Sequence, residues 1–483
     1  MALKTGEEYV SSIKSLNLEA QVMGRKTGNL TEHPLVAPSL CAIAATFDGA
    51  HSDREETRRL FRAPSSICGE EVSRFTHLHR STEDLIDKVR LQRHCGNVTA
   101  CCFQRCVGLD AANAVFSVTH ECDQKQGTAY QERFREFWRR VQLEDLVVDG
   151  AMTDPKGDRG RRPNEQKDPD LYLRVVERRP DGVVVRGAKL HQTGMLNSHE
   201  IIVMPTISMR PGEEDWAICF AIPTNTTGIR YFYGRQASDT RKMEGTRIDV
   251  GNPDYGGQEV MTVFEDVFVP EERIFLNREV EFSGPLVERF AAYHRQSYGG
   301  CKVGVGDILI GATALIARMN GVDRASHIKD KIVEMIHLNE TLYACGIACS
   351  ALGHATVAGN YQVDMLLANV CKLNVTRFPY ELARLATDVA GGLLGTLPSA
   401  KDLEDEVAGP YIRKYLAAAD GFPAVDRIKV LRLIENLVAG AGSVSYLIES
   451  MHGAGPPTAQ RIMIGRQGDV EGKIEKVKRL LGI

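Results

Sequence analysis

Three cysteines stand within six residues in the segment CCFQRC, at Cys101, Cys102 and Cys106. Cys102 and Cys106 are four positions apart, a spacing that would place both side chains on one face of an α-helix, about 40° apart around its axis. Cys101 would point about 100° away from Cys102. Two thiolates on one helix face can hold one iron cluster, although buried cysteines often act only as small hydrophobic residues.

A second segment, YHRQSYGGCKVG, places His294, Tyr298 and Cys301 at positions i, i+4 and i+7. On a helix these three side chains share one face. Gly299 and Gly300 would each weaken that helix by about 1 kcal/mol relative to alanine. We therefore expect a compensating gain, of which close approach of the backbone to a bulky group is the usual one. The alternative interpretation is a helix start with a hydrogen-bonded histidine and a buried cysteine.

Other cysteines indicate different roles. Cys345 and Cys349 repeat the spacing of four within YACGIAC, but they lack polar neighbours, and we interpret this pair as core packing. The chain has twelve cysteines, and its first residues, MALKTGEEYV, have no apolar core. We therefore expect a cytoplasmic protein without disulfides. A structural Cys₃His zinc site is the third alternative, but such sites usually contain a C-x₂-C pair, and the chain has none.

The length and net charge of the chain limit the classes of protein to which it can belong. The chain of 483 residues is long enough for two or three domains. Its net charge of −4 does not indicate the strongly basic composition typical of nucleic-acid-binding proteins. The most apolar stretch, residues 303–319, contains Asp307 and Arg318 and is shorter than the roughly 18–20 residues needed to cross a bilayer. We expect neither a nucleic acid nor a membrane as a partner.

The pattern of apolar residues divides the chain into three parts. Residues 1–148 predict a helical domain, with a capping pattern between Ser81 and Asp84. Short β-branched runs separated by turns predict a β-domain in residues 149–280, either a barrel or a sandwich. Four long helical patterns predict a bundle in residues 281–483. The expected fold class is α+β multidomain: an N-terminal helical domain, a middle β-barrel domain and a C-terminal four-helix bundle.

That order resembles the acyl-CoA dehydrogenase architecture. The segment VFEDVFVPEERIFL, residues 263–276, looks like the part of that superfamily that joins the β-domain to the bundle. MTDPKGDRG at 152–160 and GAKLHQTG at 187–194 resemble the flavin-contacting segments of its 4-hydroxyphenylacetate 3-monooxygenase branch. The resemblance is closer still to the 4-hydroxybutyryl-CoA dehydratase family.

The segments that carry this second resemblance are spread along the chain. They are ACCFQRCVG at 100–108, GGQE at 256–259, YHRQSYGGCKVG at 293–304 and ESMHGAGPP at 449–457. Several rare features occur here in the expected order and spacing. The similarity extends from one end of the chain to the other.

The resemblance implies two cofactors, a [4Fe-4S] cluster and FAD. The cluster would be held by Cys102, Cys106, Cys301 and His294. A neutral imidazole in place of one thiolate would leave its iron more electron-poor, so that this iron could act as a Lewis acid on a substrate hydroxyl. The residues expected to bind the flavin are Thr153, Asp154, Lys156, Gly157, Asp158, Arg159, His191, Gln192, Thr193, Gly391 and Gly392. The last two belong to a bundle segment expected to meet the flavin across a subunit boundary.

The implied reaction is the radical dehydration of 4-hydroxybutyryl-CoA to crotonyl-CoA. A thioester acidifies only the α position, whereas one-electron oxidation of the enolate by FAD would make the β C–H bond acidic. The residues expected to take part are His294, Tyr298, Glu449, Glu259, Lys302 and Thr193. His294 would be both ligand and base, with Glu449 as the alternative base. Tyr298 and Glu259 would hydrogen-bond the leaving hydroxyl or the flavin. Lys302 would supply positive potential near the cluster, and Thr193 would hydrogen-bond the flavin ring.

Two other activities fit parts of the sequence. A flavin-dependent aromatic hydroxylase of the 4-hydroxyphenylacetate 3-monooxygenase type would leave the four expected cluster ligands unexplained. A vinylacetyl-CoA Δ-isomerase would use the same residues as the dehydratase, and the sequence does not separate the two. The resemblance also implies a homotetramer arranged as a dimer of dimers.

Overall fold

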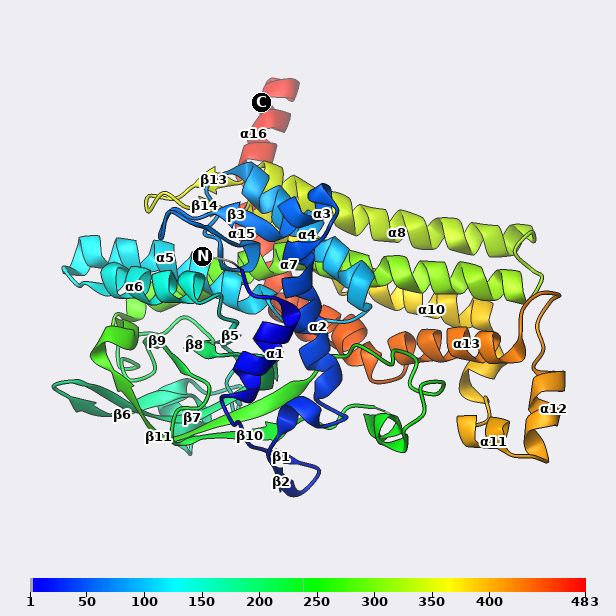
Figure 1. Cartoon of the computed structure of the whole chain (residues 1–483). Helices are drawn as coiled ribbons and strands as arrows, with labels where there is room; N and C mark the ends of the chain where they lie inside the picture. Colours follow the sequence, from blue (N-terminus) through cyan, green and yellow to red (C-terminus); the bar gives the residue numbers. More distant parts are fainter. Residues whose placement is uncertain (1–2, 238) are drawn as a thin grey trace.

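The computed structural model describes residues 3–237 and 239–483. Its N-terminal part is mainly helical, as the sequence predicts (Figure 1). The side chain of Ser81 accepts a hydrogen bond from the backbone N–H of Asp84 and so caps the long helix α4. The elements of this part are α1 (Gly6–Lys14), β1 (Ala20–Val22), β2 (Arg25–Thr27), α2 (Ala37–Asp48), α3 (Glu55–Phe61), β3 (Arg62–Pro64), β4 (Glu71–Ser73), α4 (Thr82–Thr99), α5 (Cys106–Gln126) and α6 (Tyr130–Leu143).

The middle part contains two sheets that face each other. One has six strands in the order β2-β1-β10-β11-β7-β6, and the other has four in the order β12-β9-β8-β5. Within the described residues neither sheet closes on itself, so the expected barrel is not confirmed. Strand β1, from the N-terminal part, pairs in parallel with β10 and extends the larger sheet. The strands are β5 (Val148–Ala151), β6 (Arg174–Arg179), β7 (Gly182–Thr193), β8 (Glu200–Val203), β9 (Ile218–Pro223), β10 (Ile229–Tyr233), β11 (Glu259–Pro270) and β12 (Ile274–Asn277).

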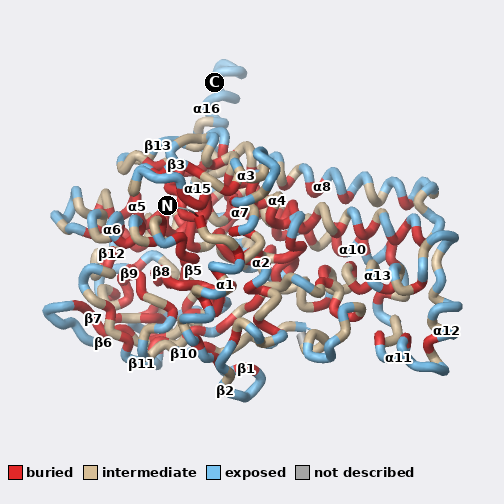
Figure 2. Tube along the Cα trace, in the orientation of Figure 1, coloured by how far each residue is buried: buried red, intermediate tan, exposed pale blue. Residues whose placement is uncertain are grey.

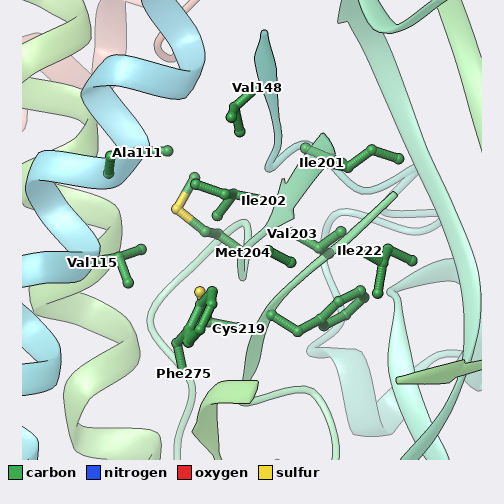
Figure 3. Packing of buried hydrophobic residues seen from close by; sticks show 14 of the residues in the cluster. Ala111, Val115, Val148, Ile201, Ile202, Val203, Met204, Cys219, Ile222 and Phe275 are labelled. Carbon is green, nitrogen blue, oxygen red and sulfur yellow. The ribbon is translucent and has the colours of Figure 1, made fainter. Parts of the chain in front are cut away.

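Helix α5 packs its apolar face on the smaller sheet. Figure 3 shows Ala111 and Val115 of α5 opposite Ile202 of β8, with Phe275 of β12 beside them. All four side chains are buried. This contact fixes the start of α5 against the β-domain, and Cys106 is the first residue of that helix.

The C-terminal part is built around α7 (Val280–Met319), a helix of 40 residues. By length and composition α7 could span a membrane, but 61% of its most apolar window is buried inside the protein. Figure 2 shows buried segments concentrated around α7, which packs against α4, α5, α8, α9, α10 and α13. Its apolar composition therefore matches its place at the centre of the molecule. The other elements are α8 (Ser326–Ala351), β13 (His354–Ala355), β14 (Tyr361–Gln362), α9 (Met365–Val375), α10 (Phe378–Ala390), α11 (Ala400–Glu404), α12 (Ala408–Tyr415), α13 (Ala424–Val438), α14 (Glu449–His452), α15 (Pro457–Gln467) and α16 (Val470–Leu481).

Two of the four expected bundle helices are divided. The third splits into α9 and α10, with Pro379 in the first turn of α10, where proline is tolerated. The fourth ends at Val438, and after a short turn the chain forms a π-helix at Val444–Ile448 that leads directly into α14. π-Helical turns are rare and frequently occur at functional sites.

Gly299 and Gly300 have a structural purpose that differs from the expected one. A Cβ atom on Gly299 would lie 2.6 Å from the Cα of Gly346 on α8. A Cβ atom on Gly300 would lie 2.5 Å from the carbonyl oxygen of Val89 on α4. The glycines therefore allow α7 to approach two neighbouring helices, and the close partner is protein backbone rather than a bulky ligand.

Candidate active site

A cavity of about 300 Å³ lies where the three parts of the chain meet. Its walls come from the loop between α4 and α5, from β5, β7 and β11, from α7, and from residues 444–455. Most of the residues predicted from the sequence line this one cavity. They are Cys102, Cys106, Thr153, His191, Gln192, Thr193, Glu259, His294, Tyr298, Cys301, Lys302 and Glu449.

Cys102 and Cys106 lie in different kinds of local structure at the cavity. Cys106 begins α5, but Cys102 lies in the loop before it, so the expectation that they share a helix face was wrong. Ala100 and Gln104 adopt left-handed backbone conformations, with φ of 50° and 63°, and these interrupt the helix. The side-chain amide of Gln104 donates to the carbonyl oxygen of Ser39 at 3.1 Å, which helps to hold the loop in place.

The three expected cluster cysteines differ in exposure: Cys106 is buried, whereas Cys102 and Cys301 are partly exposed. Desolvation raises the pKa of Cys102 and of Cys106 well above the usual value, and raises the pKa of Cys301 to about 11. The amide of Gln92 donates to the sulfur of Cys106 at 3.3 Å. Without a bound cation the neutral thiol is favoured, because the nearby charge of Lys302 only partly offsets desolvation at Cys102 and Cys301.

His294, Tyr298 and Cys301 share one face of α7, as their spacing predicts. The ring of Phe290 stacks on His294 with centroids 5.6 Å apart and planes 12° apart. Tyr298 meets the other side of the histidine, with centroids 5.2 Å apart. The imidazole is therefore held between two aromatic side chains, each one helical turn away.

Polar contacts reach the cavity from the β-domain and from α7. The hydroxyl of Thr193 donates to Glu259 at 2.7 Å, and Glu259 lines the same cavity as Glu449. Lys302 donates to Oε2 of Glu449 at 2.7 Å and also to the carbonyl oxygen of Ser445. Burial, reinforced by the neighbouring Glu449, raises the pKa of Glu259 well above its usual value. The protonated form of Glu259 is therefore favoured, and Oε1 of Glu449 has no hydrogen-bond partner among the described residues.

Tyr298 lies between two ammonium groups. The Nζ atoms of Lys302 and Lys372 stand 5.1 and 4.7 Å from the centre of its ring. Its hydroxyl packs against Gly453 so closely that a side chain at that position would overlap it. Burial, followed by the nearby charge of Lys302, lowers the pKa of Lys372 to about 7. Lys372 is fully buried and donates to the carbonyl oxygen of Ser450.

The residues expected to bind a flavin fall into two groups. Thr153, His191, Gln192 and Thr193 line the cavity, as noted above. Asp154 instead forms a buried ion pair with Lys189 at 2.8 Å and accepts a hydrogen bond from the backbone of Leu173. The remaining expected residues, Lys156, Gly157, Asp158, Arg159, Gly391 and Gly392, do not line this cavity. Gly391 and Gly392 stand exposed at the end of α10, in open space.

Comparison with known proteins identifies the family. Residues 5–276 and 283–482 match the models for the N-terminal and C-terminal parts of 4-hydroxyphenylacetate 3-hydroxylase. The chain is 55% identical, over the full length of both proteins, to the 4-hydroxybutyryl-CoA dehydratase/vinylacetyl-CoA-Δ-isomerase of Clostridium aminobutyricum. The chain belongs to the 4-hydroxybutyryl-CoA dehydratase family.

Solved structures agree with this assignment. A 4-hydroxybutyryl-CoA dehydratase from N. maritimus, described as oxygen-tolerant and archaeal, superposes with a TM-score of 0.98 and 51% identity, covering 100% of this chain and 95% of the other. The oxygenase component of 4-hydroxyphenylacetate 3-monooxygenase, solved with FAD, superposes with a TM-score of 0.85 at 22% identity, covering 99% and 98%. The second likeness shows the fold alone.

Several polar residues at the site of this dehydratase family member were not predicted from the sequence. Asp149 lines the cavity, and its Oδ2 atom has no partner among the described residues. Asp110 and Lys372 stand behind the cavity wall and contact His294 and Tyr298, which line it, and Lys88 forms an ion pair with Asp110. Each lies in a helix or strand without a recognisable sequence motif. Only the folded structure shows that it lies near the site.

Proposed function

We propose that this protein dehydrates 4-hydroxybutyryl-CoA to crotonyl-CoA and water, and that it also isomerises vinylacetyl-CoA. The observation that carries the proposal is the convergence of four residues on one cavity: Cys102, Cys106, Cys301 and His294. The full-length relative from C. aminobutyricum bears the names of both activities. Both reactions require proton transfers beside a thioester and leave a double bond in a new place.

We propose that these four residues hold a [4Fe-4S] cluster. Among the described residues, no group of three or more histidine, cysteine, aspartate or glutamate side chains could hold a single metal ion. A cluster distributes its protein ligands over several iron atoms, so it needs donors that surround a cavity rather than converge on a point. Three thiols and one imidazole around this cavity fit that requirement. Thr153, Gln192 and Thr193 on the β-domain wall would hold FAD.

When bound, FAD would supply reversible one-electron oxidation of the substrate enolate, and the cluster would supply a Lewis acid for the hydroxide that leaves C4. The chain's own residues would move the protons. The raised pKa of Glu259 favours its protonated form, so Glu259 would donate a proton and Glu449 would accept one. Lys302 forms an ion pair with Glu449 at 2.7 Å and adds positive charge beside the cavity.

Tyr298 completes this arrangement. Its hydroxyl reaches Gly453 at the wall of the cavity, and the amino groups of Lys302 and Lys372 lie near its ring. Burial raises the pKa of Tyr298 well above its usual value, so the hydroxyl keeps its proton and can donate a hydrogen bond to a substrate oxygen.

The test is anaerobic purification followed by iron, sulfide, zinc and flavin analysis and by assays with 4-hydroxybutyryl-CoA. About four irons and one FAD per chain, with crotonyl-CoA as product, are the expected results. Zinc without flavin would contradict the proposal. FAD without iron, together with hydroxylation of a phenol, would instead support the aromatic hydroxylase alternative.

We also propose that the protein is a cytoplasmic homotetramer. All twelve cysteines are free, as expected in a reducing compartment. Exposed apolar residues on α8 and α16, including Val333, Leu480 and Leu481, offer surfaces for subunit contact. Light scattering coupled to size-exclusion chromatography would measure the subunit number, and a monomer would contradict this assembly.

A further inference from the structure

A buried carboxylate stands directly behind the ring of His294. Asp110 on α5 is fully buried, and its Oδ2 atom lies 2.8 Å from Nδ1 of His294. The hydroxyl of Ser297, also on α7, donates to the same oxygen at 3.0 Å. An ionised carboxylate can only accept hydrogen bonds, so Nδ1 of His294 must carry the hydrogen.

The charge of Asp110 is fixed by a second buried residue. Lys88 on α4 is fully buried, and its Nζ atom forms an ion pair with Oδ1 of Asp110. The same ammonium group donates to the carbonyl oxygen of Tyr293 at 3.1 Å and to the side chain of Gln296 at 2.9 Å. All three of its N–H bonds therefore have a partner.

These contacts join three helices around one imidazole. Lys88 comes from α4, Asp110 from α5, and His294 from α7. Phe290 and Tyr298 restrict rotation of the ring, while Asp110 occupies one of its two nitrogens. The nitrogen that remains is Nε2, on a residue that lines the cavity.

We propose that Asp110 is a positioning residue that sets the tautomer of His294 and presents Nε2 to the cavity as the iron-binding atom. Histidine ligands of metals commonly donate their other ring N–H to a carboxylate, which fixes the ring and makes it a better ligand. This inference rests on the proposed function. It also assigns proton transfer, while His294 is bound, to the Glu259–Glu449 pair, because the imidazole then has no free nitrogen.

The test compares two buried aspartates in the reconstituted holoenzyme. Asp110→Asn changes the partner of His294, whereas the control, Asp249→Asn, makes the same change in a buried aspartate paired with Arg432 at 3.1 Å and away from the cavity. Iron release to a chelator and the ¹⁴N hyperfine coupling of the reduced cluster are measured. Asp110→Asn should release iron about 10–100 times faster and show an altered coupling, and Asp249→Asn should match the wild type.

Asp110→Asn leaves Lys88 buried without its ionic partner, which destabilises the fold. A second variant therefore tests the same proposal without this unpaired charge. The double change Lys88→Met and Asp110→Leu removes both charges, a replacement that proteins often tolerate. It should fold, lose iron quickly and lose the ¹⁴N coupling. If these variants hold iron as firmly as the wild type with unchanged coupling, Asp110 does not position His294. A wild-type protein that binds no iron at all would contradict the proposed function instead.

Discussion

Glu259 and Glu449 line the same cavity, and the charge of Glu449 acts on Glu259, although the two residues belong to different parts of the chain. Glu259 begins β11, and Glu449 follows the π-helix at the start of α14. Lys302 forms an ion pair with Glu449 at 2.7 Å. Burial and the charge of Glu449 raise the pKa of Glu259 well above its usual value, which favours the protonated form of Glu259. A proton held in this way is available for exchange with a substrate.

The Glu449→Gln variant should lose about 10²–10⁴-fold in kcat, because an amide cannot accept a proton and leaves Lys302 without its partner. Steady-state kinetics with 4-hydroxybutyryl-CoA measures the effect. Glu435→Gln is the matched control, since the side chains of Glu435 and Glu449 are both 17% exposed and both are ion-paired. Equal losses in the two variants would mean that Glu449 has only a structural role.

Serine at Cys102, Cys106 or Cys301 should lower the iron content of the purified protein, because each change removes one proposed thiolate ligand. Serine at Cys349, which is fully buried in α8 away from the cavity, should leave the iron content unchanged. Iron and sulfide analysis after anaerobic purification measures both. Full iron occupancy in all three cavity variants would remove these cysteines from the ligand set.

Asp149 should make the protein less stable as the pH rises. Burial raises the pKa of this carboxyl from 3.8 to about 8. Between those two values the folded protein binds more protons than the unfolded chain, so stability is greatest at low pH and is lost towards about pH 8. The contribution should fall by about 1.4 kcal/mol per pH unit. Asp149→Asn removes this dependence. Thermal melts at several pH values should show wild type losing Tm relative to the variant as pH increases, and parallel curves would contradict the assignment.

Gly300→Ala should destabilise the protein by about 1–3 kcal/mol, because its new methyl group would meet the backbone oxygen of Val89 at 2.5 Å. Gly311→Ala lies in the same helix with nothing within 4 Å of its Cβ position. This control should instead stabilise by about 0.5–1 kcal/mol through better helix propensity. Thermal unfolding of both variants measures the difference, and a neutral Gly300→Ala would show that α7 and α4 can separate.

Much of the site could be predicted because helical spacing is a local property. His294, Tyr298 and Cys301 share a face of α7 simply because they are four and seven residues apart. Cys345 and Cys349 likewise lie within α8, away from the cavity, as their apolar surroundings indicate. Where all the residues belong to one regular helix, their spacing in the sequence is enough to predict which side chains lie together.

The parts of the site and of the fold that the sequence did not predict depend on contacts between distant segments. The loop at Cys102 carries no glycine or proline, and the left-handed turns at Ala100 and Gln104 are held by tertiary contacts. The same limit applies to Asp110 and Lys88, whose roles exist only because α4, α5 and α7 meet. The strands were recognised, but which strands pair and whether the sheet closes depend on packing that the pattern of β-branched residues does not encode.

The cavity wall extends from Cys101 to Gly455 along the chain. During synthesis on the ribosome, the first cysteines therefore emerge long before the residues that complete the enclosure. No cofactor can contact the whole site until the segment up to Gly455 has been synthesised. Until then the early thiols depend on the reducing power of their surroundings.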